Sequence, residues 1–117
     1  MDPQSVLLFN VEPAERGLAQ ALEADGHLVA SHERNIRPTL LDAHPDATVL
    51  CFSTSTLVGA ELLDRLPRLR MIATRSTGYN HIDLAYLRQR GIALANCVDY
   101  AGPTVAEHAF ALLLAMT

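Results

Sequence analysis

Short apolar segments alternate with segments of helical pattern along almost the whole of this 117-residue chain. Strands of a parallel sheet that is covered on both faces read as nearly continuous apolar runs, and the helices between them provide the crossover connections. The alternation predicts an α/β fold: a doubly wound, flavodoxin-like parallel five-stranded sheet with helices on both faces, ending in an apolar helix. The expected strands are Ser5–Asn10, His27–Ser31, Ala47–Phe52, Arg70–Thr74 and Ile92–Asn96. The expected helices are Ala14–Asp25, Ile36–His44, Leu57–Leu66, Asp83–Arg90 and Thr104–Met116.

The composition is typical of one cytoplasmic domain. Half of the residues are apolar, and the net charge is −4, with no lysine and no basic run to neutralise the phosphates of a nucleic acid. The N-terminus lacks the pattern of a signal peptide, and the longest apolar run, Ala109–Met116, is too short to span a bilayer. Cys51 and Cys97 lie far apart in apolar segments, which is typical of buried thiols in a reducing compartment. We therefore expect a cytoplasmic protein with neither a nucleic-acid nor a membrane partner.

The segment Thr74–Asp83 follows the fourth expected strand at its carboxyl end, where doubly wound sheets bind their ligands. Gly78 permits a sharp turn that exposes consecutive backbone N–H groups, and such a concavity suits an oxyanion. The next helix is expected to begin nearby, with Asp83 as a candidate N-cap. On the residues alone, an ordinary strand-to-helix turn is the simpler interpretation.

The segment Asn96–His108 follows the fifth expected strand. Gly102-Pro103 forces a turn, and Thr104 forms a capping box with Glu107 three residues later. Helix initiation is therefore the first role of both residues, which does not exclude a second role. The helix that follows carries apolar side chains on more than one face, so the sheet alone cannot bury them all. We expect this helix to mediate self-association.

From Leu69 to Thr117 the sequence resembles the substrate-binding domain of the NAD-dependent D-2-hydroxyacid dehydrogenases, particularly the D-lactate dehydrogenase branch. The string ATRSTGYNHIDL is similar to the loop that binds the substrate carboxylate in that family. The resemblance implies that the backbone amides of Thr77 and Gly78 hold a small 2-keto or 2-hydroxy carboxylate. It also implies that the hydroxyl of Tyr100 contacts the same carboxylate.

Other residues receive weaker assignments from the same resemblance. Phe52, at the end of the third expected strand, falls where relatives contact the substrate side chain, although an ordinary core aromatic is an equally good interpretation. Thr104 falls near the nicotinamide end of the coenzyme. We assign no catalytic residue and no metal ligand, because the family's catalytic Arg, Glu and His come from later in the chain. Arg75 is expected to brace the loop through hydrogen bonds, and His81 to be a structural or surface residue.

The coenzyme that the resemblance implies, NAD(H), has no recognisable binding site in this sequence. The six glycines are isolated and form no G-x-G, so the pyrophosphate-binding fingerprint is absent. We expect residues 1–103 to form the N-terminal part of the substrate-binding domain and residues 104–117 an inter-domain and dimerisation helix, with the dinucleotide-binding domain absent. Such a chain would be inactive on its own and would form a homodimer through its last helix. The alternative is a stand-alone α/β dimerisation or regulatory interaction module.

Overall fold

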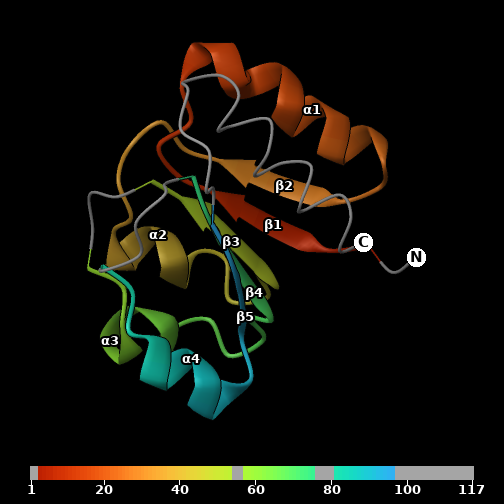
Figure 1. Cartoon of the computed structure of the whole chain (residues 1–117). Coiled ribbons are helices and arrows are strands. Elements are labelled where there is room, and N and C mark those ends of the chain that lie inside the picture. The colour runs from red at the N-terminus through yellow and green to blue at the C-terminus, as the bar shows by residue number, and fades with distance from the viewer. Residues whose placement is uncertain (1–2, 54–56, 76–80, 97–117) are drawn as a thin grey trace.

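The computed structural model describes residues 3–53, 57–75 and 81–96, and places five parallel strands of this part of the chain in one sheet (Figure 1). The strands are β1 (Ser5–Leu8), β2 (Leu28–Ser31), β3 (Val49–Phe52), β4 (Met71–Thr74) and β5 (Ala93–Ala95). Their order in the sheet is β2-β1-β3-β4-β5. The chain thus moves outward from β1 to β2 and then returns past β1 to β3. This order is that of flavodoxin-like folds, and it confirms the predicted doubly wound sheet.

Helices cover both faces of the sheet (Figure 1). The described helical elements are a 3₁₀ turn, η1 (Pro13–Glu15), and the helices α1 (Arg16–Ala24), α2 (Pro38–Asp42), α3 (Ala60–Leu63) and α4 (Leu84–Arg90). In Figure 1, α1 lies on one side of the sheet and α2, α3 and α4 lie on the other. The predicted apolar helix Thr104–Met116 lies outside the described residues.

Alternate residues of each central strand enter two separate cores. Leu7, Leu50 and Ile72 pack with the buried leucines of α2, α3 and α4. Their neighbours along the strands pack with Ala19 and Leu22 of α1. Successive side chains of a strand point to opposite faces, so a sheet covered on both sides needs apolar residues at every position. This requirement explains the continuous apolar runs from which the fold was predicted.

Local residues account for the ends of the two longest helices. The helical segment that contains η1 and α1 begins with a capping box, in which Glu12 N–H donates to Glu15 Oε1 over 3.0 Å, and it is followed by Gly26 at φ 94°. In α4, the Asp83 carboxylate accepts the Tyr86 N–H at 3.1 Å, and Gly91 at φ 70° ends the helix. The predicted N-cap role of Asp83 is confirmed.

The predicted helix Leu57–Leu66 is much shorter in the structure, where α3 begins only at Ala60. Val58 instead forms an isolated parallel bridge with Ile82. Its N–H donates to the His81 carbonyl over 2.7 Å, and its carbonyl accepts the Asp83 N–H at 2.9 Å. The apolar pattern of this segment was assigned to a helix, but tertiary pairing with a distant segment holds its first part extended. The bridge joins the approach to α3 with the approach to α4.

The two edge strands are less buried than the central ones. The side chains of β2 and β5 are partly or fully exposed, and Leu28 of β2 keeps 73% of its surface accessible. β2 and β5 are the outermost strands, so each has a neighbouring strand on one side only. Their apolar runs resemble those of the central strands, and the sequence pattern therefore does not show which strands form the edges. Within the described residues, no helix has the length and apolar character needed to cross a bilayer.

Candidate functional site at the carboxyl edge of the sheet

The predicted site residues belong to segments that follow the strands at the carboxyl edge of the sheet. Thr77, Gly78, Tyr100 and Thr104 lie outside the described residues, so their roles stay predictions. Phe52, the last residue of β3, has 1% of its surface exposed and belongs to the core beside α2, α3 and α4. Its ring meets the His81 ring edge-on, with centroids 5.7 Å apart. This packing agrees with the core interpretation, and contact with a ligand stays a prediction for Phe52.

Arg75 follows β4 directly and is held by three groups of the neighbouring segments. Its guanidinium donates to the Glu15 carboxylate at 2.7 Å, to the Asn10 carbonyl at 2.9 Å and to the Phe9 carbonyl. The Arg75 and Glu15 side chains are only 5% and 14% exposed. The expected hydrogen-bonded brace is confirmed, and it ties the end of β4 to the end of β1 and to η1. A guanidinium engaged in this way has a structural role.

His81 holds the other end of the segment 76–80. Its carbonyl accepts the Val58 N–H, and its Nε2 lies 3.5 Å from the Thr74 hydroxyl. Burial lowers the pKa of the His81 imidazole, so the ring is neutral near pH 7. The expected structural role of His81 agrees with these contacts. Arg75 and His81, the described residues on either side of 76–80, are therefore both held by contacts with the sheet or with neighbouring loops.

The start of α4 has less to offer an anion than the sequence suggested. The Asp83 carboxylate already accepts the Tyr86 N–H there and brings a negative charge to the positive end of the helix. This carboxylate offsets the attraction of the helix dipole for an anion at the start of α4.

Asn10 is a residue of this edge that sequence reasoning missed. Its backbone has φ 58°, in the left-handed region that asparagine tolerates better than most residues. Its N–H donates to the Arg34 carbonyl over 3.0 Å, its Oδ1 accepts the Ser53 N–H at 3.1 Å, and its Nδ2 donates to Asn35. Asn10 thus links the segments that follow β1, β2 and β3. The only signal in the sequence is a polar residue at the end of an apolar run, which indicates no more than the end of a strand.

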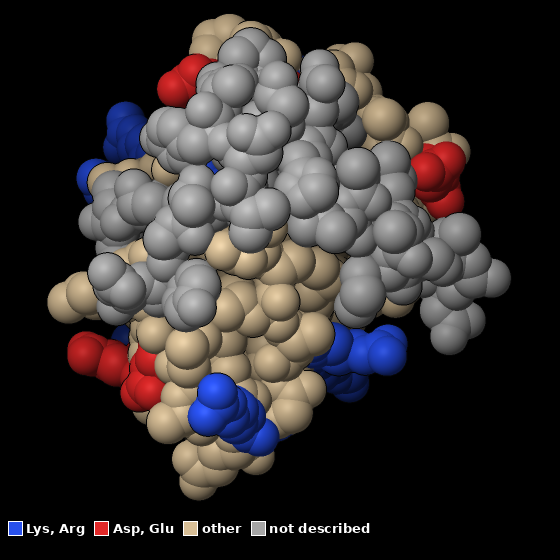
Figure 2. Space-filling view, viewed as in Figure 1, with Lys and Arg blue, Asp and Glu red and all other residues tan. Residues whose placement is uncertain are grey.

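The described residues form no group of three or more His, Cys, Asp or Glu side chains that could hold a metal ion. On the face shown in Figure 2, the described acidic and basic side chains lie in small separate groups with uncharged side chains between them. The described residues therefore form no broad patch of one charge on the part of this face that they occupy.

Lowering the pH from about 7.5 to about 5 should reduce the free energy of unfolding through two histidines. Burial lowers the pKa of His81, and burial together with the nearby His44 lowers the pKa of His32. The unfolded chain binds protons at the ordinary pKa of about 6.5, whereas the folded protein binds them only at lower pH. Stability is therefore complete above about pH 6.5 and falls as the pH drops through the folded-state pKa values.

Urea denaturation at a series of pH values measures this effect, and the double variant H32Q/H81Q serves as the control. The difference in stability between the parent chain and this variant should change over the same pH interval. If the difference in stability between the two chains stays constant with pH, His32 and His81 are not the source of the pH dependence.

Comparison with known proteins finds relatives of one kind. A glyoxylate reductase of Pyrococcus furiosus is 39% identical over 88 residues, which cover 74% of this chain and 26% of that protein. Glyoxylate/hydroxypyruvate reductase B of Klebsiella pneumoniae is 32% identical over 113 residues, which cover 94% of this chain and 34% of that protein. Among solved structures, D-lactate dehydrogenase from Aquifex aeolicus, in complex with NAD and lactic acid, superposes with a TM-score of 0.71 at 29% identity, covering 94% of this chain and 33% of that one.

The chain therefore spans between about a quarter and a third of the length of these relatives. The family model described as D-isomer specific 2-hydroxyacid dehydrogenase, catalytic domain, matches residues 6–116, which is nearly the whole chain. The match includes the described sheet as well as the segments 76–80 and 97–116. This chain belongs to the D-isomer specific 2-hydroxyacid dehydrogenase family.

Proposed function

We propose that this chain is the part of an NAD-dependent D-2-hydroxyacid dehydrogenase that binds the carboxylate of a small 2-keto or 2-hydroxy acid. The backbone amides of Thr77 and Gly78 hold the carboxylate, and the Tyr100 hydroxyl assists. Phe52 lies next to a small apolar group of the substrate, and Thr104 lies near the nicotinamide of the coenzyme. The observation that supports this proposal best is the family match, together with the contacts that hold Arg75 and His81 at the carboxyl edge of the sheet.

The carboxylate needs donors that are already oriented, because ordering a loop on binding costs free energy that weakens affinity. Arg75 and His81 flank residues 76–80 and are themselves held by hydrogen bonds, so in this proposal they act on the site without contacting the ligand. In the proposed site the chain binds and orients the substrate, while hydride transfer and proton transfer use groups outside it. In this proposal, no residue of this chain has a catalytic role.

NAD(H) is the coenzyme that the family implies, and the first strand–helix turn of this chain does not fit it. Dinucleotide-binding folds hold the pyrophosphate at a glycine-rich turn after their first strand. Here the corresponding turn contains no glycine, the Phe9 and Val11 side chains are buried, and the carbonyls of Phe9 and Asn10 accept hydrogen bonds from Arg75. We propose that NAD(H) is not bound by this chain alone.

The remaining features of the proposal concern the arrangement of the chain. Residues 1–103 form the N-terminal part of the substrate-binding domain, and residues 104–117 form an inter-domain helix that also joins two copies of the chain in a homodimer. The location is cytoplasmic. The relatives named above are dehydrogenases and reductases, which favours this function over a stand-alone regulatory module.

Titration of the 117-residue chain with lactate or pyruvate should shift the amide NMR signals of Thr77 and Gly78. A dissociation constant in the millimolar range is expected, since only part of a substrate site is present. Lactamide, which has the same shape without the negative charge, should cause no comparable shifts. The same sample should oxidise no NADH in the presence of pyruvate.

Two results would contradict the proposal. If lactate causes no shifts even at high concentration, or if lactamide causes equal shifts, the chain has no specific carboxylate site. An interaction module would then be the better account. Turnover of NADH above background would show that the chain contains a coenzyme site.

A further inference from the structure

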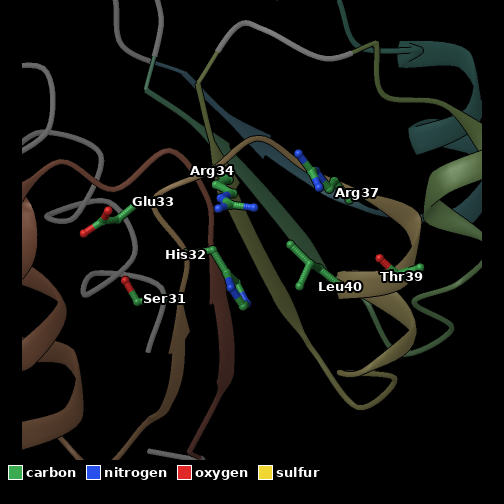
Figure 3. Close-up of a pocket in the computed structure, with 7 residues that line it drawn as sticks. All are labelled: Ser31, His32, Glu33, Arg34, Arg37, Thr39 and Leu40. Carbon is green, nitrogen blue, oxygen red and sulfur yellow. The ribbon is translucent and has the colours of Figure 1, made fainter.

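A cavity lies beside the carboxyl end of β2, on the side of α2 (Figure 3). Its volume is about 490 Å³, within the range of sites that bind small metabolites. The residues that line it belong to the end of β2, the segment that follows it, and α2: Ser31, His32, Glu33, Arg34, Arg37, Thr39 and Leu40. None of them belongs to the predicted carboxylate-binding set.

The charges around this cavity are unbalanced. Arg34 and Arg37 are exposed, and neither side chain forms an ion pair or a hydrogen bond with another described residue. In Figure 3 the two guanidinium groups extend from opposite sides toward the space between them, whereas Glu33 points away. The Glu33 carboxylate is already paired with Arg16. Two arginines that face each other without a counter-charge repel, and a bound anion removes that repulsion.

The other lining groups are neutral. The His32 ring stacks on Phe9 with centroids 5.1 Å apart, and burial together with His44 lowers its pKa, so it adds no charge near pH 7. The hydroxyls of Ser31 and Thr39 are hydrogen-bond donors of the kind that phosphate and carboxylate oxygens accept. The positive charge of the cavity therefore comes from Arg34 and Arg37.

Backbone hydrogen bonds fix the wall of the cavity in place. The His32 N–H donates to the Leu8 carbonyl over 2.9 Å, and the His32 carbonyl accepts the Val11 N–H at 3.1 Å. The Arg34 carbonyl accepts the Asn10 N–H at 3.0 Å. A wall that is ordered before binding loses little conformational freedom when a ligand enters.

We propose that this cavity binds a small oxyanion with at least two negative charges, of the phosphate or dicarboxylate class, through the guanidinium groups of Arg34 and Arg37. Guanidinium groups match both kinds of oxyanion because they donate paired hydrogen bonds in a planar fork. The site is separate from the proposed substrate loop. Asn10 links the wall of the cavity to the segment that follows β3, since its N–H donates to the Arg34 carbonyl and its Oδ1 accepts the N–H of Ser53.

The test is a titration of the chain with inorganic phosphate at constant ionic strength, followed through backbone amide signals. Saturable shifts are expected for Arg34, Arg37 and Thr39, with a smaller shift for Ser53. R34Q and R37Q should each weaken binding by about tenfold, the usual loss for one charge-assisted hydrogen-bonded group. A parallel titration with malonate distinguishes a dicarboxylate ligand from a phosphate ligand, and saturable binding of either supports the proposal.

R88Q is the matched control, because Arg88 is an equally exposed arginine on α4, away from the cavity. It removes the same charge and should leave the phosphate affinity unchanged. If R88Q loses as much affinity as R34Q, the binding is a non-specific attraction to positive charge, and the proposal is overturned. Absence of saturation by both anions, or equally strong binding of singly charged acetate, would also overturn it. Signals of Thr77 and Gly78 under lactate are read separately, so failure of one site does not affect the test of the other.

Discussion

The variant R75M is expected to lose about 3–5 kcal/mol of unfolding free energy, the usual effect of removing one partner of a buried ion pair. The Glu15 carboxylate, 14% exposed, would remain without its cation. The carbonyls of Phe9 and Asn10 would lose their hydrogen bonds from the guanidinium at the same time. Methionine keeps most of the side-chain length, so the loss would report on charge and hydrogen bonds rather than on volume. Urea denaturation followed by circular dichroism measures the change.

R88M provides the matched control for this prediction. Arg88 lies exposed on α4, and the same substitution there should change the stability by less than about 0.5 kcal/mol. The variant E15Q breaks the pair from its other side, and a double-mutant cycle with R75M gives the coupling energy between the two residues. A loss below about 1 kcal/mol in R75M, or independent effects of the two substitutions, would contradict a structural ion pair.

R75K tests whether the charge alone is sufficient. Lysine keeps the positive charge but has no planar fork, so it cannot reproduce bonds to a carboxylate and two carbonyls together. Its stability should lie between those of the parent chain and R75M. Since Arg75 immediately precedes the 76–80 segment, weaker lactate-induced shifts of Thr77 and Gly78 in folded R75K would connect the brace to carboxylate binding.

The sheet was predictable because its cause is repeated along the chain. Each central strand must bury both faces, so each contributes a short continuous apolar run, and the rules for crossover connections leave only a few possible strand orders. The helix that begins at Pro38 and the N-cap at Asp83 were predictable because each depends on residues that are close together in the sequence. The start of α3 was not, because Val58 is held extended by His81 and Asp83, which follow it by more than twenty residues.

The same distinction explains what could be predicted about the site. The position of Arg75 at the carboxyl edge followed from its place after a strand, and its bracing role followed from its place beside the expected loop. The partners of Arg75 did not follow, because Glu15 lies 60 residues away and has no local signal apart from the capping box. Asn10 was missed because its left-handed backbone and its bond to Ser53 arise only once β1 and β3 are paired.

F52A is expected to destabilise the protein by about 3–5 kcal/mol, the usual cost of removing a buried phenyl ring from a core. Phe52 is almost completely buried, in the core shared by α2, α3 and α4, and its ring contacts His81. Its removal would leave a cavity beneath the carboxyl edge and would take away the packing partner of one end of the 76–80 segment. Denaturation by urea gives the loss directly. The control is L57A, since Leu57 is 81% exposed and its truncation should cost less than about 0.5 kcal/mol.

F52L separates the two interpretations of this residue. Leucine fills most of the space, so the variant should lose only about 1 kcal/mol and remain folded for binding measurements. If the ring edge touches the substrate side chain, the dissociation constant for lactate should rise in F52L while the shifts still fall on Thr77 and Gly78. An unchanged constant would restrict Phe52 to the core. In that case, residues that follow β3 would recognise the substrate side chain, and the ring of Phe52 would not.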